Sequence, residues 1–173
     1  MRLDDRPQRI LLPVNVGFMA LSFVLALLFN LLPWRNIAGV PDLAALVLTF
    51  WCVHQPRRIG VGAAWVLGLA MDAGNGALLG QHAFAYSILA FAALGLHRRI
   101  LWFSPWQQAA HVLPLLLACQ VLALGVRMIA GGAFPGYAYF AGSFVAAALW
   151  PAATFVLLLP QRRPESVDEN RPI

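Results

Sequence analysis

The sequence predicts an all-α integral membrane protein whose six transmembrane helices form one bundle. Three observations support this prediction. Of the 173 residues, 61% are hydrophobic and only 11% are charged, and the apolar residues gather in long runs. An ordinary soluble domain is about 45–50% apolar and about 25% charged. The composition therefore excludes a soluble enzyme domain, a disordered chain and a secreted disulfide scaffold.

The first three spans follow from apolar runs and the residues that bound them. The run 10–32 has no charged residue and exceeds the roughly 7–15 apolar residues of a signal peptide, so we expect it to remain as a span. The second span, 41–54, opens with Pro41-Asp42. These residues mark a helix start, because proline fits the first helical turn and a carboxylate there faces the positive end of the helix dipole. The third span is 59–79.

The other three predicted spans are 82–96, 106–130 and 137–159. Pro114 can kink the fifth span. Spans two and four fall short of the roughly 20 residues that cross a bilayer, so their ends are the least well defined. Residues 1–159 are thus expected to form one six-helix membrane domain, and the polar residues 160–173 a disordered cytoplasmic tail.

Arginine placement tests the number of spans. All twelve basic residues are arginine, and with six spans ten of them fall on one side: Arg2, Arg6, Arg9, Arg57, Arg58, Arg98, Arg99, Arg162, Arg163 and Arg171. Arg35 and Arg127 fall on the other side. The positive-inside rule then predicts that both termini are cytoplasmic. The net charge of +5 is therefore explained by arginines that set the orientation in the membrane, and we expect no nucleic-acid partner.

Three charged residues lie inside predicted spans, where a charge costs roughly 2.5–3.5 kcal/mol near the bilayer centre. Asp42, Asp72 and Arg127 all fall in the outer half. Asp42 is interpreted as a helix start rather than a ligand. Arg127 either reaches the outer headgroups or pairs inside the bundle. Asp72 either accepts hydrogen bonds from a neighbouring helix, pairs with Arg127 or is protonated, and a structural role is favoured over a proton relay.

The remaining ionisable side chains predict no cofactor or metal site. Cys52 and Cys119 lie in apolar runs and are expected to pack in the core. The four histidines, His54, His82, His97 and His111, lie near the ends of spans and are not expected beside Asp72. No nucleotide-binding, metalloprotease or nucleophile-elbow motif is present, and the loops are too short for a catalytic domain. We therefore expect a protein that is not an enzyme.

Small residues recur at every fourth position of the third span: Gly60, Ala64, Gly68, Gly76 and Gly80, with Asp72 in the same series. Such a stripe lets two helix backbones approach closely. Packing within the chain is favoured over a contact with a partner, although the stripe serves either. The sequence Gly74-Asn75-Gly76 can end the helix, and free backbone N–H groups there could bond to Asp72.

Residues 41–83 contain an ordered set of short motifs: Pro41-Asp42-Leu43, Phe50-Trp51, Pro56, Gly60, Gly68-Leu69, Asp72, Gly76 and Leu79-Gly80. Further along lie Trp106-Gln107-Gln108-Ala109 and Leu149-Trp150-Pro151. With this set and its six-span layout, the whole chain resembles the MreD family of bacterial rod-shape-determining proteins. Phe50 departs from the family pattern, which often has tyrosine there.

The resemblance implies a non-enzymatic inner-membrane protein of the elongation machinery, needed for rod shape and lateral peptidoglycan synthesis. Its implied direct partner is MreC, which has a single span and a periplasmic domain. MreB, RodA and a class B penicillin-binding protein are implied members of the same complex, and membrane lipids surround it. The family is also similar in outline to the six-helix substrate-binding subunits of energy-coupling-factor vitamin transporters. The alternative function is therefore a membrane subunit that binds a small molecule or lipid.

Overall fold

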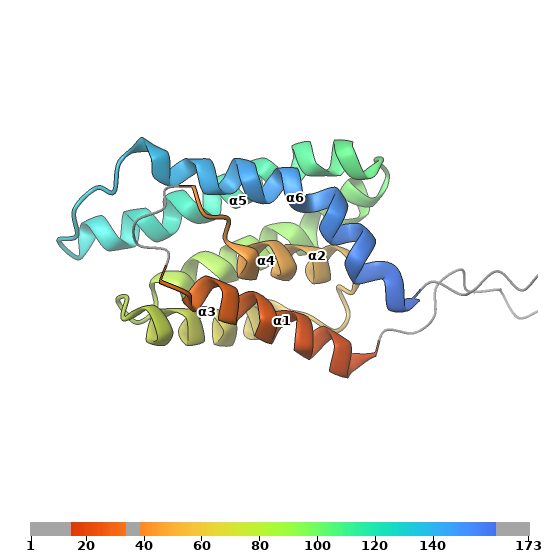
Figure 1. Ribbon diagram of the computed structural model, residues 1–173, viewed down its shortest axis with the longest axis horizontal. Coiled ribbons are helices and arrows are strands. Elements are labelled where there is room, and N and C mark those ends of the chain that lie inside the picture. Colours follow the sequence, from red (N-terminus) through yellow and green to blue (C-terminus); the bar gives the residue numbers. More distant parts are fainter. Residues whose placement is uncertain (1–14, 34–38, 162–173) are drawn as a thin grey trace, which may run out of the picture.

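The computed structural model describes residues 15–33 and 39–161, and all the regular secondary structure in this part of the chain is helical (Figure 1). It holds six α-helices and two short 3-10 helices: α1 Val16–Leu31, α2 Leu43–His54, α3 Val61–Asn75, α4 Gln81–Leu101, α5 Pro105–Ile129, η1 Tyr137–Phe140, α6 Ala141–Leu158 and η2 Leu159–Gln161. The all-α prediction is confirmed, and each predicted span overlaps one α-helix.

The helices differ in length. Three of them, α4, α5 and the continuous segment Tyr137–Gln161, are long and apolar enough to cross a membrane, whereas α1 and α2 are shorter apolar helices. The 12 residues of α2 extend only about 18 Å at the helical rise, against a hydrocarbon core of about 30 Å. The backbone N–H and C=O groups left free at the ends of α2 must therefore find hydrogen-bond partners in other parts of the protein.

Helix α4 is longer than the predicted span 82–96, because it continues to Leu101 and includes Arg98 and Arg99 in its last turn. The apolar run that predicted the span ends before Arg98 and Arg99, whereas the helix continues past them. Cationic side chains are favourable at a helix C-terminus, where they face the negative end of the dipole. The predicted tail lies outside the described residues from residue 162 onward, and Gln161 is buried in η2.

Helix α2 is the centre of the bundle, with nine of its 12 residues buried. It packs against α1, α4 and α6, and α3 packs mainly against α4. Phe50, Trp51 and Trp150 are fully buried, and the rings of Phe50 and Trp51 meet edge to face at 5.0 Å. Cys52 and Cys119 are buried and unbonded, as expected of core residues. The core is therefore built around a helix that has little contact with the surroundings.

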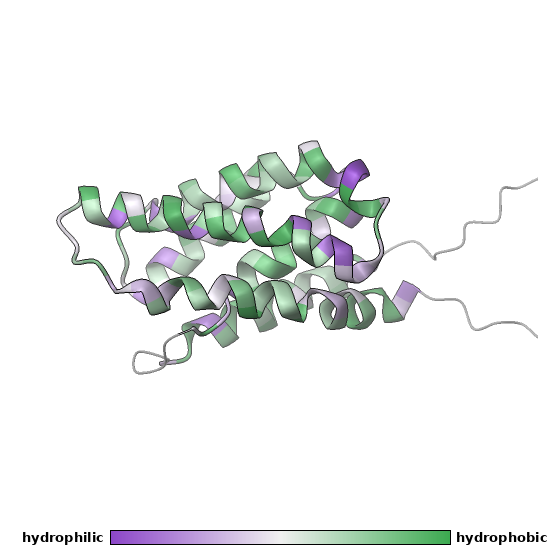
Figure 2. Cartoon of the chain, turned by 90° about the horizontal axis from the view of Figure 1, so that it is seen from above, coloured by the Kyte–Doolittle hydropathy of each residue, from purple (hydrophilic) through white to green (hydrophobic). Residues whose placement is uncertain are grey.

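Apolar side chains also cover the outside of the bundle. Figure 2 shows hydrophobic residues along the length of the helices, with the most hydrophilic ones mainly towards their ends. Phe91 is 73% exposed and Leu25 is 57% exposed. In water such a surface would be unfavourable, whereas a lipid bilayer is its natural solvent.

The helices alternate in direction, so the bundle has two distinct ends (Figure 1). At one end, here called the arginine end, α2 and α4 finish and α3 and α5 begin, with Arg57, Arg58, Arg98 and Arg99 nearby. At the other end, here called the cavity end, α1, α3 and α5 finish and α2, α4 and α6 begin. Arg127, in the last turn of α5, lies at the cavity end.

Candidate functional site

Asp72 lies in the last turn of α3 and is fully buried. Its carboxylate accepts hydrogen bonds from the backbone N–H groups of Gly80 and His82, each at 2.9 Å, and of Ala83 at 3.4 Å. Helix α4 begins at Gln81 with Gly80 as its N-cap, a residue that has no side chain to cap it. Asp72 therefore caps α4 from the neighbouring helix and satisfies N–H groups that a helix start leaves free.

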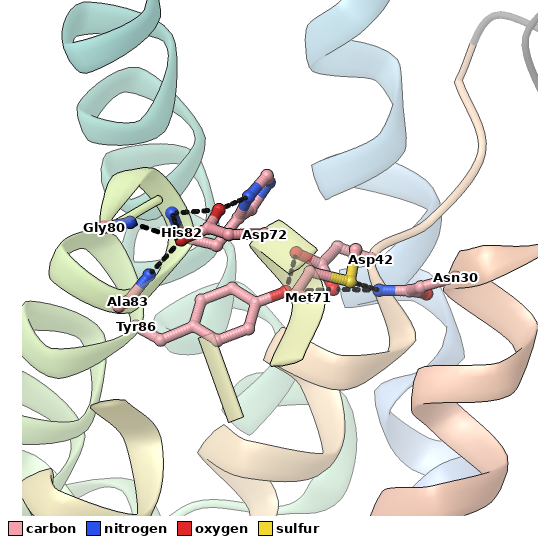
Figure 3. Close-up of polar contacts among 8 residues, drawn as sticks. All are labelled: Asn30, Asp42, Met71, Asp72, Gly80, His82, Ala83 and Tyr86. Atoms are coloured by element: carbon pink, nitrogen blue, oxygen red, sulfur yellow. Dashed lines mark hydrogen bonds and ion pairs between the residues drawn. The ribbon is translucent and has the colours of Figure 1, made fainter. Parts of the chain in front are cut away.

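His82 lies directly beside Asp72, with its ring Nδ1 2.7 Å from Oδ1 of the carboxylate (Figure 3). The expectation that no histidine lies beside Asp72 was wrong for this residue. His82 is at the start of a helix, as predicted, but the turn formed by residues 76–80 folds α4 back along α3 and brings this start against the end of α3. An ion pair of Asp72 with Arg127, one of the alternatives considered for Asp72, is not among the contacts of the described residues, in which His82 is its partner.

The backbone donors to Asp72 come from a neighbouring helix, which was one of the alternatives considered for this residue. They come from the residues that open α4, not from Gly74 to Gly76. Gly76 instead ends α3 in the left-handed conformation, with φ at 61°, and Gly80 has φ at 102°. Both positions favour glycine because a side chain is strained at positive φ. The turn is therefore shaped by two glycines and closed by one carboxylate.

Asp42 is the N-cap of α2, as predicted, and its carboxylate accepts a hydrogen bond from the N–H of Ala45 at 2.9 Å. The same carboxylate accepts from Nδ2 of Asn30 in α1 at 2.6 Å and from the hydroxyl of Tyr86 in α4 at 2.8 Å. Asn30 in turn accepts from the N–H of Leu43 at 3.1 Å. Figure 3 shows these side chains converging from three helices. Asp42 thus joins α1, α2 and α4 at the cavity end.

A cavity of about 260 Å³ lies beside this cluster. Its polar lining comes from α1, the N-cap of α2, α3, α4, α5 and η1: Asn30, Asp42, Asn75, His82, Tyr86, Gln120 and Tyr139. A second cavity, of about 940 Å³, adjoins it and is lined by Arg127, and the two cavities share Asn75, His82 and Tyr139 as walls. Pockets that combine apolar walls with a few convergent polar groups are the usual form of a binding site.

The small-residue stripe divides into two kinds of position. Ala64 and Gly68 are buried, and a Cβ atom added to Gly68 would overlap the backbone of Ala83 in α4. Gly60, Gly76 and Gly80 have open space where a Cβ would lie. The close approach at Gly68 is therefore a contact within the chain, between α3 and α4.

The comparisons with known proteins agree with this architecture. The chain matches the family described as "rod shape-determining protein MreD" over residues 12–161. The chain belongs to the MreD family. The rod shape-determining protein MreD of Haemophilus influenzae is 31% identical over 153 residues, which cover 84% of this chain and 91% of that relative. No solved structure matches the chain.

Membership in the MreD family identifies a multi-pass membrane protein that acts in rod cell shape and is not an enzyme. Within residues 15–33 and 39–161, no three histidine, cysteine or acidic side chains are grouped as a metal site would require. In this MreD protein, the polar residues around Asp42 and Asp72 are held together by hydrogen bonds and by the contact of Asp72 with His82.

Sequence reasoning missed three members of the cluster: Asn30, His82 and Tyr86. Each is a polar residue within a few positions of a helix end, which is the only signal that could have found it. Arg127 is exposed and lines the second cavity. No carboxylate of the described residues lies within salt-bridge distance of it.

Proposed function

We propose that this MreD protein is a non-enzymatic membrane scaffold of the cell-elongation complex, supporting lateral peptidoglycan synthesis by binding MreC. The observation that supports it best is the family match over residues 12–161, which spans all six helices of the bundle. MreB, RodA and a class B penicillin-binding protein would then join through the same complex.

Six crossings of the inner membrane are part of this proposal. The long helices α4, α5 and α6 have the length for it, and α1, α2 and α3, with 16, 12 and 15 residues, are shorter. Backbone that is not helical is tolerated at membrane depth where protein encloses it. The enclosure of α2 by α1, α4 and α6, with side-chain caps from Asp42 and Asn30, supports a crossing by this short helix.

The proposed orientation places both termini in the cytoplasm. It is supported by four arginines of the described residues at the arginine end, against Arg127 alone at the cavity end. Alkaline phosphatase fused within residues 131–136 should be active, because this enzyme folds only outside the cytoplasm, and the same fusion after Arg171 should be inactive. The reverse pattern would overturn the orientation.

The partner proposal is tested by co-purification. The tagged full-length protein, extracted in mild detergent, should recover MreC, whereas MreC with its span replaced by an unrelated apolar helix should be recovered much less. Equal recovery of both forms would place the contact outside the membrane, and no recovery of either would overturn the proposed contact. Gly68 is a poor probe for this test because it packs within the chain.

The alternative function, binding of a small molecule or lipid in the manner of a vitamin-transporter subunit, has one observation in its favour: the paired cavities at the cavity end. It does not exclude the scaffold role. The likeness in outline to those transporter subunits remains a prediction.

A further inference from the structure

The two cavities at the cavity end are lined by residues of opposite charge, and neither residue has an ion-pair partner among the described residues. Asp42 lines the first, and Arg127 lines the adjoining one. Asp72, the other carboxylate of the described residues, is fully buried and is occupied by His82 and the start of α4. It therefore does not neutralise Arg127.

The described partners of Asp42 carry no charge. Its donors are the amide of Asn30, the backbone of Ala45 and the hydroxyl of Tyr86, all of which are neutral groups. No arginine of the described residues lies within salt-bridge distance. The dipole of α2 contributes the equivalent of only about half a positive charge at its N-terminus. A cationic group entering the cavity would complete the site, because charge-assisted hydrogen bonds are the strong ones in a low dielectric.

The shared walls connect the two charges. Asn75, His82 and Tyr139 line both cavities, so the two cavities adjoin at these residues, with Asp42 in the wall of one and Arg127 in the wall of the other. The first cavity, at about 260 Å³, is large compared with the roughly 30 Å³ that one water occupies in the liquid, but small for a whole lipid. It therefore fits a headgroup-sized cation, and the larger cavity fits the anion and what is attached to it.

We propose that the paired cavities bind a zwitterionic phosphoethanolamine group, with its ammonium at Asp42 and its phosphate at Arg127. A phospholipid headgroup and free phosphoethanolamine have this chemistry in common. The inference depends on the two cavities and their charges, not on the scaffold role, and it is tested on the purified chain without any partner.

The test measures retention of lipids by the full-length protein in mixed-lipid nanodiscs, using native mass spectrometry. Phosphatidylethanolamine should be retained at least about tenfold over phosphatidylglycerol, which lacks the ammonium, since a hydrogen bond between charged groups is worth at least that factor. Phosphatidylcholine should also be retained less, because its quaternary nitrogen has no N–H to donate. Equal retention of the three lipids, with no binding of free phosphoethanolamine, would overturn the proposal.

Substitutions at Asp42 and Arg127 then test which residue binds the ammonium and which binds the phosphate. Asp42→Asn keeps an N-cap, since asparagine caps helices as well as aspartate does, but it should lose most of the preference for phosphatidylethanolamine. Arg127→Gln should weaken retention by removing the phosphate contact. Arg98→Gln, a matched change at the arginine end, should leave retention unchanged. Wild-type retention in both Asp42→Asn and Arg127→Gln would overturn the proposal. If a variant unfolds, the comparison of ethanolamine and choline lipids on the wild-type protein decides the question alone.

The source of the ligand is decided by competition. Free phosphoethanolamine that displaces the retained lipid shows that the headgroup alone occupies the site. Binding of free phosphoethanolamine without any lipid preference, lost in Asp42→Asn, supports the same site with a soluble ligand.

Discussion

The two ends of the bundle close their helices in different ways. At the arginine end most side-chain hydrogen bonds are local: Ser104 pairs with Gln107, Gln108 with Phe103, and His97 with Leu94, although Gln108 also accepts from Trp150 of α6. At the cavity end they connect distant parts of the chain. Asp42 binds Asn30, 12 residues away, and Tyr86, 44 residues away. The arginine end is thus closed mainly by local caps, whereas at the cavity end Asp42 and its partners form a network across three helices.

The difference follows from access to polar surroundings. Ser104 and Gln107 are exposed, so water or lipid headgroups can satisfy whatever the local caps leave free. Asp72 is fully buried and must find all its partners inside the protein, because a buried polar group without a hydrogen bond is costly. We therefore expect substitutions in the network to be more damaging than substitutions in the caps.

The largest effect on folding is expected at Gly68, where α3 and α4 pack closely. Leucine at Gly68 would overlap the backbone of Ala83 and push α4 away from α3, so Gly68→Leu should yield little folded monomer in fluorescence-detected size-exclusion chromatography. Gly62→Leu is the matched control, because Gly62 is exposed on the same helix and has open space around it. A normal monomer peak for Gly68→Leu would contradict the packing.

Asp72→Ala should be the next most damaging change. It removes the acceptor of three backbone N–H groups and of His82, and each buried donor left unpaired costs about 1–3 kcal/mol. Asp72→Asn should lose less, since its amide oxygen still accepts hydrogen bonds. Thermal unfolding in detergent measures the order. Equal midpoints for the two variants would show that capping of α4 does not depend on an acceptor at this position.

A smaller effect is expected at Gln108, the buried polar residue at the arginine end. Its Oε1 accepts from Nε1 of Trp150 at 3.0 Å, so Gln108→Leu should cost about 1–3 kcal/mol by leaving the indole N–H unpaired. In a double-mutant cycle with Trp150→Phe, the two losses should add to more than the loss in the double variant. Additive losses would show that the pair contributes nothing of its own.

Tyr86→Phe should have the smallest effect, about 1 kcal/mol, because Asp42 keeps its bonds to Asn30 and Ala45. Tyr137→Phe provides the control, since that ring is 86% exposed. Both variants are measured by the same thermal unfolding. If Tyr86→Phe unfolds as early as Asp72→Ala, the cavity-end network is more cooperative than its separate bonds indicate.

The features that sequence reasoning predicted are those that depend on neighbouring residues. Asp42 as the start of α2 needed only Pro41 and the N–H three residues on. The small-residue stripe was correctly favoured as an internal contact at Gly68, but Gly76 and Gly80 serve the turn through positive φ. The partner of Asp72 was missed because His82 comes beside it only after the turn folds back.

The sequence by itself determined that this protein belongs in a membrane, roughly where its apolar helices lie along the chain, and that Asp42 begins the second of them. These properties follow from composition and from contacts a few residues apart, which any folded arrangement of the helices would share. The tertiary structure decided which side chain each carboxylate binds, and that Asp42 and Arg127 face adjoining cavities. Such pairings join residues tens of positions apart, so they exist only once the helices have packed.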